Sequence, residues 1–421
     1  MISPKCNLNC KYCYLRRFED GLYPEDIYDE EKIFENTIKI IHWLGKNNYR
    51  PELNLFSGEL FAQSIGYRIM DEMLKIYTEH PEYSRPAAII IPSNFTFILS
   101  DELTEKVEYY IKEFKKQQVN IGLSASLDGL YMENINRAYN DCKTDMKISG
   151  ARNQAFYDKV FAFCKKHGCG LHPMIYSNNI ENWKKNFDWF MEMHDKHNID
   201  WRTLYLLEVR DYNWNREQIE QYADLLVHML NYAYDRCQRE GHDFISYFYK
   251  RNENNHWNMA FNILFSLFCK TGTGVSCSLQ NSVMIRAADM KHFPCHRLSY
   301  PEFLLGKFDI DDDYNGKYTC ENMELMIGMY SFDPKTQPIC SDCTINTMCV
   351  HGCHGSQYET NKETFVPIPS VCNLFYKKVH TIVNWFIEKE LFSDLLGLVS
   401  PDSRLQLIHL YEEIIGEKNN D

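Results

Sequence analysis

The chain has 421 residues, of which 44% are hydrophobic and 14% aromatic; this excludes a disordered protein and suits two domains, or one large barrel with an appended domain. Its net charge of −13 argues against a nucleic-acid partner, because phosphate binding needs a basic face. No apolar run reaches transmembrane length and no signal peptide precedes the first cysteines, so we expect no membrane partner.

The first predicted element is a loop with three cysteines, Cys6, Cys10 and Cys13, in the run SPKCNLNCKYCYL. In a chain of this length and cysteine content, the expected number of such triplets by chance is roughly 0.02. Three thiolates this close can hold one face of an iron–sulfur cluster and leave a fourth iron open for chemistry, because such clusters normally take four cysteines. A structural zinc is the alternative, but zinc sites usually close with a fourth Cys or His, and none follows within the next 28 residues.

This CxxxCxxC spacing, with Tyr12 before the last cysteine, resembles the signature of the radical S-adenosylmethionine (SAM) superfamily. The resemblance implies that the open iron chelates SAM and that reduction of the cluster yields a 5′-deoxyadenosyl radical, which abstracts hydrogen from substrate. It also implies an external one-electron reductant of the flavodoxin or ferredoxin type. Thiols that must stay reduced to bind iron point to the cytoplasm. Because only Met1 to Lys5 precede Cys6, we expect a short first strand at most, and either a truncated start or a separately encoded peptide-binding module.

From residue 29 onward, predicted helices alternate with predicted strands. The helices are expected at 29–44, 67–77, 101–116, 154–167 and 181–197, and the strands at 53–56, 87–91, 119–129, 170–177 and 203–209. Such alternation predicts an α/β protein with a parallel sheet that binds its ligand at the carboxyl ends of the strands. With the short first strand the count is six, that of the family's partial (β/α)₆ TIM-like barrel, which we expect over residues 1–213. An incomplete barrel leaves a lateral opening for a peptide.

The strand at 53–56 leads into Ser57, Gly58, Glu59 and Leu60. This run resembles the family's GGEP motif, which binds the amino group of SAM, with Ser57 in place of glycine and Leu60 in place of proline. Gly58 would permit close approach of the backbone, and Glu59 would pair with an ammonium group. An ordinary strand-to-helix turn is the alternative.

Polar residues after later strands complete the expected SAM site. The resemblance implies that the turns with Asn94 and Ser126 contact the ribose and methionine parts of SAM, and that a downstream arginine meets the carboxylate. Arg137 is the expected arginine and Arg152 the second choice, with a solvated surface charge as the alternative for both.

Three further polar residues, His172, Tyr176 and Glu208, lie near predicted strand ends that face the expected active site. We interpret each first as a packing or supporting residue. Glu208 is kept as a weak catalytic candidate.

The second half begins with predicted helices. One long helix is expected over 215–240, and a second, rich in Phe and Leu, should end near Cys269. Together they are expected to form a bridging segment over 214–270. Two closing helices are predicted at 374–390 and 403–415, mostly within a C-terminal segment over 376–421.

A second cysteine pattern follows, with intervals of two, five and three residues and one cysteine farther on: Cys340, Cys343, Cys349, Cys353 and Cys372. The expected number of chance occurrences of its four-cysteine part is roughly 0.001 per chain. With Cys277 and Cys295 upstream, the set resembles the SPASM domain, which we expect over 271–375.

The resemblance to SPASM implies two auxiliary [4Fe–4S] clusters, and thus three clusters in all. The outer cluster would be held by Cys340, Cys343, Cys349 and Cys372. The inner cluster would be held by Cys277, Cys295 and Cys353. A zinc site is the alternative for residues 340–353, although a loop of five residues is short for zinc modules.

Two departures from the SPASM pattern stand out. Met290 occupies the position of an expected glycine, five residues before the second cysteine, which weakens the assignment of a turn there. The inner cluster has no certain fourth ligand: Cys320 or Cys269 could complete it, or an open iron could bind a substrate thiolate. The remaining cysteines are interpreted as buried apolar residues: Cys142, Cys164, Cys169 and Cys237.

Enzymes of this type mostly modify peptides or proteins. Some are sulfatase maturases, which oxidise one Cys or Ser to formylglycine, and others install thioether or carbon–carbon crosslinks in ribosomally made peptides. Sulfatase maturases usually have an aspartate, proposed as the base, after the cysteine that matches Cys295, and this chain has His296 there. We therefore predict peptide crosslinking, with His296 as a weak catalytic candidate. Sulfatase maturation is the alternative and a small-molecule substrate comes third; a non-catalytic metal-binding scaffold is the hypothesis from another class.

Overall fold

The structure is a computed structural model that describes residues 1–15, 28–139, 144–249, 279, 282–333, 337–349, 351–399 and 401–418. The chain divides into two compact units. The first comprises Met1–His172 with Leu279–Ser331, and the second Pro173–Ser278 with Phe332–Asp421. The sequence predicts four segments, which are divided by their expected roles and not by compactness: 1–213, 214–270, 271–375 and 376–421. This division stays a prediction. Each unit is described below by itself.

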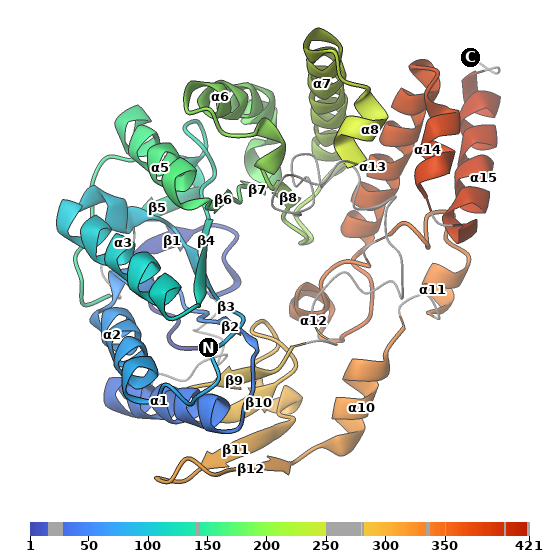
Figure 1. The fold of residues 1–421 in the computed structure, drawn as a ribbon. Coiled ribbons are helices and arrows are strands. Elements are labelled where there is room, and N and C mark those ends of the chain that lie inside the picture. The colour runs from blue at the N-terminus through green and yellow to red at the C-terminus, as the bar shows by residue number, and fades with distance from the viewer. Residues whose placement is uncertain are drawn as a thin grey trace. The chain divides into compact units, whose positions relative to one another are not determined.

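A parallel sheet forms the centre of the first unit (Figure 1), as the alternation of helices and strands predicts. Its strands run in the order β2 (Glu52–Asn54), β3 (Ala88–Ser93), β4 (Asn120–Ala125) and β6 (Gly170–Leu171). Ile89 and Ile91 of β3 are fully buried, because alternate side chains of this strand point into the core. The predicted parallel sheet is therefore confirmed, whereas the six-stranded partial barrel stays a prediction.

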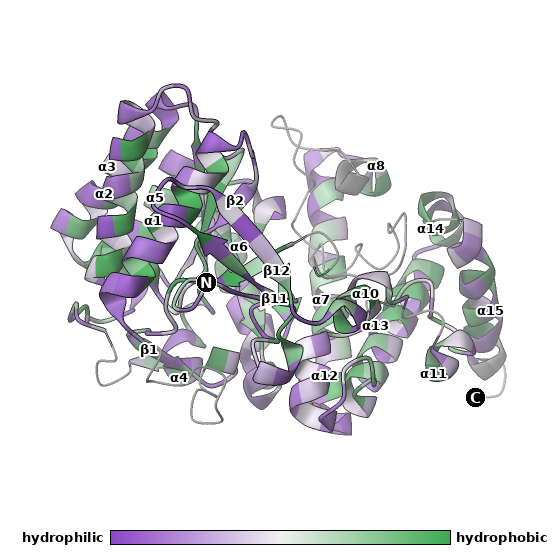
Figure 2. Ribbon diagram, turned by 90° about the horizontal axis from the view of Figure 1, so that it is seen from below, coloured by the Kyte–Doolittle hydropathy of each residue, from purple (hydrophilic) through white to green (hydrophobic). Residues whose placement is uncertain are grey.

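Helices connect the strands of this sheet. They are α1 (Glu30–Lys46), η3 (Leu60–Ala62), α2 (Ser64–Glu79), η4 (Thr96–Leu99), α3 (Asp101–Lys116), α4 (Glu133–Asn136) and α5 (Gln154–His167). Caps fix several ends: the Ser100 side chain accepts from Leu103 N–H before α3, and α5 ends at Gly168, whose φ is 69°. Hydrophilic and hydrophobic residues alternate along α1, α2 and α3 (Figure 2), as expected for helices with one buried face.

The first strand lies inside the cysteine motif rather than before it. β1 (Leu8–Cys10) pairs antiparallel with β5 (Arg137–Tyr139), with Cys10 opposite Arg137. The residues ahead of it lie along 56–59 without forming a regular strand: Ile2 N–H donates to the Phe56 carbonyl at 2.8 Å, and Gly58 N–H to the Ser3 carbonyl at 2.7 Å. The loop is thus held by backbone bonds on both sides of its first cysteine.

Four short antiparallel strands complete the first unit, in the order β12-β11-β10-β9. They are β9 (Met284–Arg286), β10 (Lys291–Phe293), β11 (Gly306–Ile310) and β12 (Gly316–Cys320), with η8 (Pro301–Phe303) between β10 and β11 and α10 (Met323–Ser331) after β12. Met290 closes the β9–β10 turn with a φ of 60°, the left-handed conformation usually taken by glycine. The turn therefore forms, with Met290 in place of the glycine expected there.

The second unit holds two parallel strands, β7 (Met174–Ile175) and β8 (Leu207–Glu208). The strand predicted at 170–177 is thus divided at His172 and Pro173, since β6 pairs with β4 and β7 with β8. Helical elements follow: η5 (Ser177–Asn182), α6 (Trp183–Lys196), η6 (Trp201–Thr203), α7 (Arg216–Glu240) and α8 (Phe244–Tyr249). A capping box of Asn215 and Gln218 starts α7 at the predicted place.

Further helices come from the end of the chain: α11 (Pro338–Ser341), α12 (His354–Asn361), α13 (Pro369–Glu388), α14 (Phe392–Leu398) and α15 (Pro401–Lys418). The helix predicted from residue 374 begins at Pro369, because proline suits a first helical turn, so Cys372 lies inside it. α14 is absent from the prediction, and the helix predicted to end near Cys269 lies outside the described residues. Within the described part of the chain, no helix has the length and apolar character needed to cross a bilayer.

Candidate active site

The three cysteines of the first loop lie close together in the first unit. Cys13 N–H donates to the Cys10 carbonyl at 3.1 Å, and Leu8 N–H donates to Cys6 Sγ at 3.3 Å. Burial raises the pKa of Cys6, and the neighbouring thiols Cys10 and Cys13 add to the effect. Burial likewise raises the pKa of Cys10 to about 12. Buried thiols of this kind become thiolates when a metal replaces their protons, so the donor set fits an iron–sulfur cluster.

Glu59 is 1% exposed and accepts three hydrogen bonds from neutral donors. Phe61 N–H donates to Oε1 at 3.2 Å, Ser93 Oγ to Oε1 at 2.9 Å, and Asn94 N–H to Oε2 at 2.5 Å. Burial raises the pKa of this carboxyl to about 7, although the three donors act in the opposite direction. A cation placed beside Glu59 would offset its burial, which suits an ammonium ligand.

Gly58 is needed for packing against the chain that enters the cysteine loop. A Cβ atom at Gly58 would lie 2.2 Å from the Pro4 carbonyl oxygen and 2.4 Å from that of Lys5. Ser57 Oγ donates to the Ser3 carbonyl at 2.7 Å, and Gln63 Nε2 to the Lys5 carbonyl at 2.9 Å. The close backbone approach expected of this glycine is therefore present, but its partner is the protein's own backbone.

Asn94 is tied to the cysteine loop through its side-chain amide. Its Nδ2 donates to Asn7 Oδ1 at 2.8 Å and lies 3.8 Å from Cys6 Sγ, while its Oδ1 accepts from Thr96 N–H at 3.0 Å. Ser126 directly follows β4, and its N–H donates to the Ser93 carbonyl at 2.8 Å. Contacts of Asn94 and Ser126 with SAM stay a prediction.

Arg137 lies on the other side of the loop, opposite Cys10, and is 5% exposed. Its Nη1 donates to the Tyr12 hydroxyl at 3.1 Å, and that hydroxyl donates to Asp128 Oδ1 at 2.7 Å. Its Nε lies 3.1 Å from Glu133 Oε1 without forming a hydrogen bond. Because a guanidinium has five N–H donors, Arg137 keeps donors for a carboxylate ligand.

Arg152 is 2% exposed and its contacts are with protein groups. Its Nη1 donates to Glu133 Oε1 at 2.6 Å, its Nη2 donates to the Arg137 carbonyl, and the guanidinium lies 4.6 Å from the centre of the Tyr139 ring. A solvated surface charge is therefore wrong for both arginines. Arg152 positions the segment that carries Arg137, which leaves Arg137 as the better carboxylate ligand.

His296 joins three segments of the first unit. Its ring stacks on Phe56 with centroids 4.4 Å apart and lies 5.3 Å from the ring of Tyr14. Phe56 precedes the SGEL run, Tyr14 follows Cys13, and His296 follows Cys295. The side chain keeps solvent-exposed surface, while burial of the ring lowers its pKa to about 4, so His296 is neutral near pH 7. An accessible imidazole therefore lies beside the two motifs predicted to bind SAM.

Glu208 lies in the second unit and is 2% exposed. Its Oε2 accepts from Tyr222 Oη at 3.3 Å and from Lys378 Nζ at 3.4 Å, and its Oε1 lies 3.5 Å from Arg210 Nε. Burial opposes ionisation of Glu208, but Lys378 and Arg210 together hold its pKa below the usual value. Glu208 is thus an ionised partner of a buried lysine and a half-buried arginine, which fits a supporting residue.

His172 and Tyr176 have local partners. His172 N–H donates to the Ala125 carbonyl at 2.8 Å, and burial lowers the pKa of its imidazole to about 4, so the ring is neutral near pH 7. Tyr176 is buried, and its hydroxyl accepts from Asn178 Nδ2 at 3.2 Å. Both fit the packing role expected of them.

Four cysteines of the second unit influence one another. Burial raises the pKa of Cys349 to about 12, and the thiols of Cys372, Cys343 and Cys340 contribute. Cys372 keeps exposed surface, yet its pKa rises to about 11 through partial burial of the thiol and then through Cys340 and Cys343. Among the described residues, no three His, Cys, Asp or Glu side chains are placed to share a single metal ion. A cluster of several iron and sulfide ions is wider than one ion, so thiolates that hold it stand farther apart.

The remaining predicted ligands are distributed over both units. Cys295 follows β10, Cys320 ends β12 opposite Gly306, and Cys353 precedes α12. Cys142, Cys269 and Cys277 lie outside the described residues. Three cysteines without an assigned ligand role are buried or half-buried, in agreement with the apolar role predicted for them: Cys164, Cys169 and Cys237.

No protein-family model and no curated protein matches the sequence. Solved structures do match. A histidine-tagged anSMEcpe with bound AdoMet has a TM-score of 0.58 and 16% sequence identity, over 97% of this chain and 96% of that chain. "Native anSMEcpe with bound AdoMet and Kp18Cys peptide" has a TM-score of 0.56 and 16% identity, over 94% and 97%. The chain has the fold of anSMEcpe.

anSMEcpe is an anaerobic sulfatase-maturating enzyme of the radical SAM/SPASM type, and AdoMet is SAM. Its likeness to this chain extends over nearly the whole of both molecules. The resemblance drawn from the cysteine spacings thus agrees with the fold. The first unit of this chain brings together most of the residues predicted to bind the first cluster and SAM: Cys6, Cys10, Tyr12, Cys13, Ser57, Gly58, Glu59, Asn94 and Arg137.

Sequence reasoning missed residues that hold these groups in place. Asn7 lies within the cysteine loop and Gln63 shortly after the SGEL run, so neighbourhood alone could have indicated them. Glu133 stands four residues before Arg137, the spacing at which helical side chains meet. Arg152, the second partner of Glu133, lies 19 residues after it, and no spacing in the sequence indicates that these two side chains meet.

Proposed function

We propose that the protein is a radical SAM/SPASM maturase, which removes hydrogen from a ribosomally synthesised peptide and closes a thioether or carbon–carbon crosslink. One observation carries the proposal: within the cysteine loop, Cys6 lies near a buried carboxylate, Glu59, and Cys10 lies opposite a buried guanidinium, Arg137. Amino acids such as the methionine part of SAM present an ammonium and a carboxylate, which these two groups complement.

Each residue then has a role of its own. The three cysteines hold a [4Fe–4S] cluster and leave one iron for SAM. Glu59 accepts from the amino group and Arg137 donates to the carboxylate. With SAM bound and an external reductant of the flavodoxin or ferredoxin type, this site would supply the one-electron chemistry that yields a 5′-deoxyadenosyl radical, and we place this reaction in the cytoplasm.

Crosslinking removes two electrons from the peptide, so the second electron needs an acceptor. Two auxiliary [4Fe–4S] clusters would supply it, the outer one held by four cysteines of the second unit: Cys340, Cys343, Cys349 and Cys372. Cys277, Cys295 and Cys353 would hold the inner one, with Cys320, Cys269 or a substrate thiolate as its fourth ligand. The mutual influence of the four thiols of the outer set supports this part of the proposal.

His296 is proposed as the base that takes a proton from the attacking nucleophile. It lies against Phe56 and Tyr14 and remains accessible, whereas Glu208 is already engaged by Lys378 and Arg210. Base catalysis requires a free acceptor within reach of the substrate, and His296 meets this requirement better.

Substitution of Cys6, Cys10 and Cys13 by alanine tests the proposal. The triple variant should form no 5′-deoxyadenosine from SAM and dithionite, while auxiliary iron and sulfide remain bound. Glu208→Gln serves as a control that should retain cleavage. Continued SAM cleavage by the triple variant would refute the assignment. A separate measurement counts iron and sulfide in the unaltered protein, and a content that fits only one four-iron cluster per chain would refute the two auxiliary clusters.

Formylglycine formation is the second candidate function, because the similar anSMEcpe was solved with peptides named Kp18Cys and Cp18Cys. The two functions differ in product mass. A cysteine peptide converted to formylglycine loses sulfur, whereas a crosslinked peptide loses two hydrogens and keeps its sulfur. Mass spectrometry of reacted peptides therefore separates them.

A further inference from the structure

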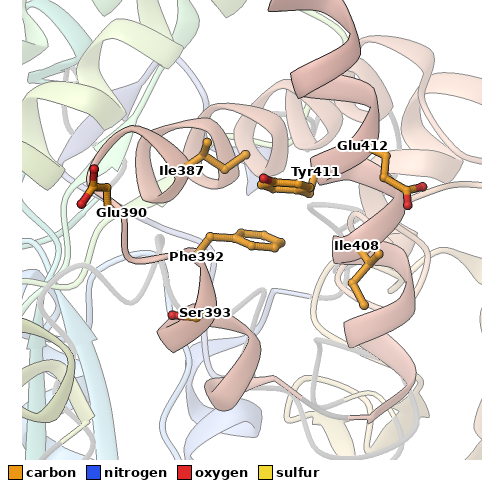
Figure 3. A pocket seen from close by; sticks show the side chains of 7 residues that line it. All are labelled: Ile387, Glu390, Phe392, Ser393, Ile408, Tyr411 and Glu412. Atoms are coloured by element: carbon orange, nitrogen blue, oxygen red, sulfur yellow. The ribbon is translucent and has the colours of Figure 1, made fainter.

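Three helices of the second unit line an open surface pocket of about 530 Å³ (Figure 3). Its apolar lining comes from Ile387 in α13, Phe392 in α14, and Ile408 and Tyr411 in α15. The rings of Phe392 and Tyr411 stack with centroids 4.7 Å apart. A volume of this size lies within the usual range for ligand pockets.

Two carboxylates flank this apolar surface. Figure 3 shows Glu390 and Glu412 on opposite sides of the two stacked rings. Glu412 lies 3.6 Å from His409, and no lysine or arginine is among the described residues that line the pocket. Glu390 follows the end of α13 with a φ of 59°, a conformation in which glycine is usual at a helix end. The pocket is thus acidic at both ends and apolar between them.

The apolar surface continues along α15 beyond the pocket. Leu405 is 65% exposed and Ile408 39% exposed. With Glu412 they follow the spacing i, i+3, i+7, which places all three on one face of the helix. Ile408 already lines the pocket, so Leu405 extends its apolar surface by one side chain, and an apolar groove of this kind can receive an amphipathic helix.

We propose that this groove binds a helix of the peptide substrate that carries leucine and lysine at helical spacing, outside the modified segment. This inference rests on the proposed function. An apolar side chain of the helix would enter between Phe392 and Ile408, and lysines one turn away on either side would pair with Glu390 and Glu412. A second copy of this chain fits less well, because self-complementary pairing of the patch would bring its own carboxylates together. Anionic lipid headgroups are repelled for the same reason.

Binding of a synthetic peptide to the full, anaerobically reconstituted protein tests the inference. The probe is a fluorescein-labelled peptide of leucine and lysine at helical spacing, about 18 residues long so that a helix can form. Fluorescence anisotropy should report binding that weakens with salt. The same peptide with glutamate in place of lysine should not bind.

Variants locate the binding surface. Phe392→Ala should weaken binding about tenfold, and so should Leu405→Ser, an exposed position where the substitution leaves the core intact. The pair Glu390→Gln and Glu412→Gln should weaken it about fivefold. The matched control pair, Glu102→Gln and Glu105→Gln on α3, changes the net charge equally and should leave binding unchanged.

Several outcomes would overturn the inference. These are equal weakening by the control pair, no weakening by the groove variants, binding of anionic vesicles that Leu405→Ser abolishes, or a dimer in sedimentation that Leu405→Ser dissociates. Formation of 5′-deoxyadenosine from SAM is measured in the same preparations and should persist in the groove variants. Its absence from the unaltered protein would refute the proposed function, while the peptide titration would still report on the groove.

Discussion

Two buried glutamates, Glu59 in the first unit and Glu208 in the second, differ in the charge of their partners. They are 1% and 2% exposed, and each follows or ends a short parallel strand. Glu59 accepts from two backbone N–H groups and a serine hydroxyl, and its pKa rises to about 7. Glu208 lies beside Lys378 and Arg210, and its pKa is lowered.

The difference separates the carboxylate that we propose to bind SAM, Glu59, from a structural one, Glu208. Burial penalises the charge of both, but only Glu208 has its cations within contact distance. No cation of the described residues is in contact with Glu59, and Arg137 acts on it only as a weaker influence, so an ammonium ligand would gain from pairing with it. A buried acid that still needs a cation is therefore better evidence for a ligand site than a buried acid that has one.

The largest expected effect comes from Lys378→Met, which removes the buried cation that contacts Glu208. The free energy of unfolding should fall by about 3 kcal/mol, because an uncompensated charge stays buried. Urea unfolding at pH 7 measures this loss. The double variant Lys378→Met with Glu208→Gln should recover most of it, and failure to recover would show that Glu208 is not the group left unpaired.

The two acids should also give stability slopes of opposite sign with pH. The pKa of Glu59 is about 7 in the folded protein and 4.5 in the unfolded chain. The free energy of unfolding therefore falls as pH rises from 4.5 to 7, by about 3 kcal/mol at most. Glu208 is lowered instead, so its contribution is present above pH 4.5 and is lost as pH falls through its folded pKa.

Urea titrations of the unaltered protein and of two variants separate these slopes. Glu59→Gln should abolish the decline between pH 4.5 and 7, and Glu208→Gln should leave that decline in place. A decline that survives Glu59→Gln would assign it to another group.

A smaller effect is expected on ligand affinity. Glu59→Gln should weaken SAM binding to the reconstituted protein about thirtyfold, close to 2 kcal/mol, because a charge-assisted hydrogen bond is lost. Glu208→Gln should leave the affinity unchanged. Equilibrium dialysis with labelled SAM measures both, and equal losses in the two variants would contradict the distinction between these acids.

The smallest effect is expected from a neutral donor. Ser93→Ala removes one hydrogen bond to Glu59 and should cost about 1 kcal/mol of stability while raising the pKa of Glu59 further. Ser84→Ala, which removes a hydroxyl bond to the Tyr49 carbonyl, is the matched control and should not shift that pKa. A Ser93→Ala loss as large as that of Lys378→Met would erase the contrast between neutral and charged partners.

Local signals predicted much of the helical framework. α3 and α5 have the predicted bounds, because Ser100 and Asn153 cap their starts and Gly168 ends α5. The β9–β12 sheet went unpredicted, since strands of three to five residues show too little alternation to be recognised.

The candidate site was predicted in its residue types rather than in its contacts. The spacing of three cysteines indicates iron without any knowledge of the fold, but no pattern indicates that Arg152 and Arg137 share Glu133. Gly58 shows the same limit: the need for a small residue was evident, yet its neighbour, the backbone of Pro4 and Lys5, is set by tertiary structure.

The pairing of β1 with β5 has a mechanical consequence. Cys10 and Arg137 face each other across two hydrogen-bonded strands, so the proposed iron ligand and the guanidinium proposed to bind the cofactor move as one rigid piece. Thermal fluctuations that loosen one must loosen the other. Protection of these strand amides from hydrogen exchange should therefore rise when iron is added, even before any sulfonium compound is present.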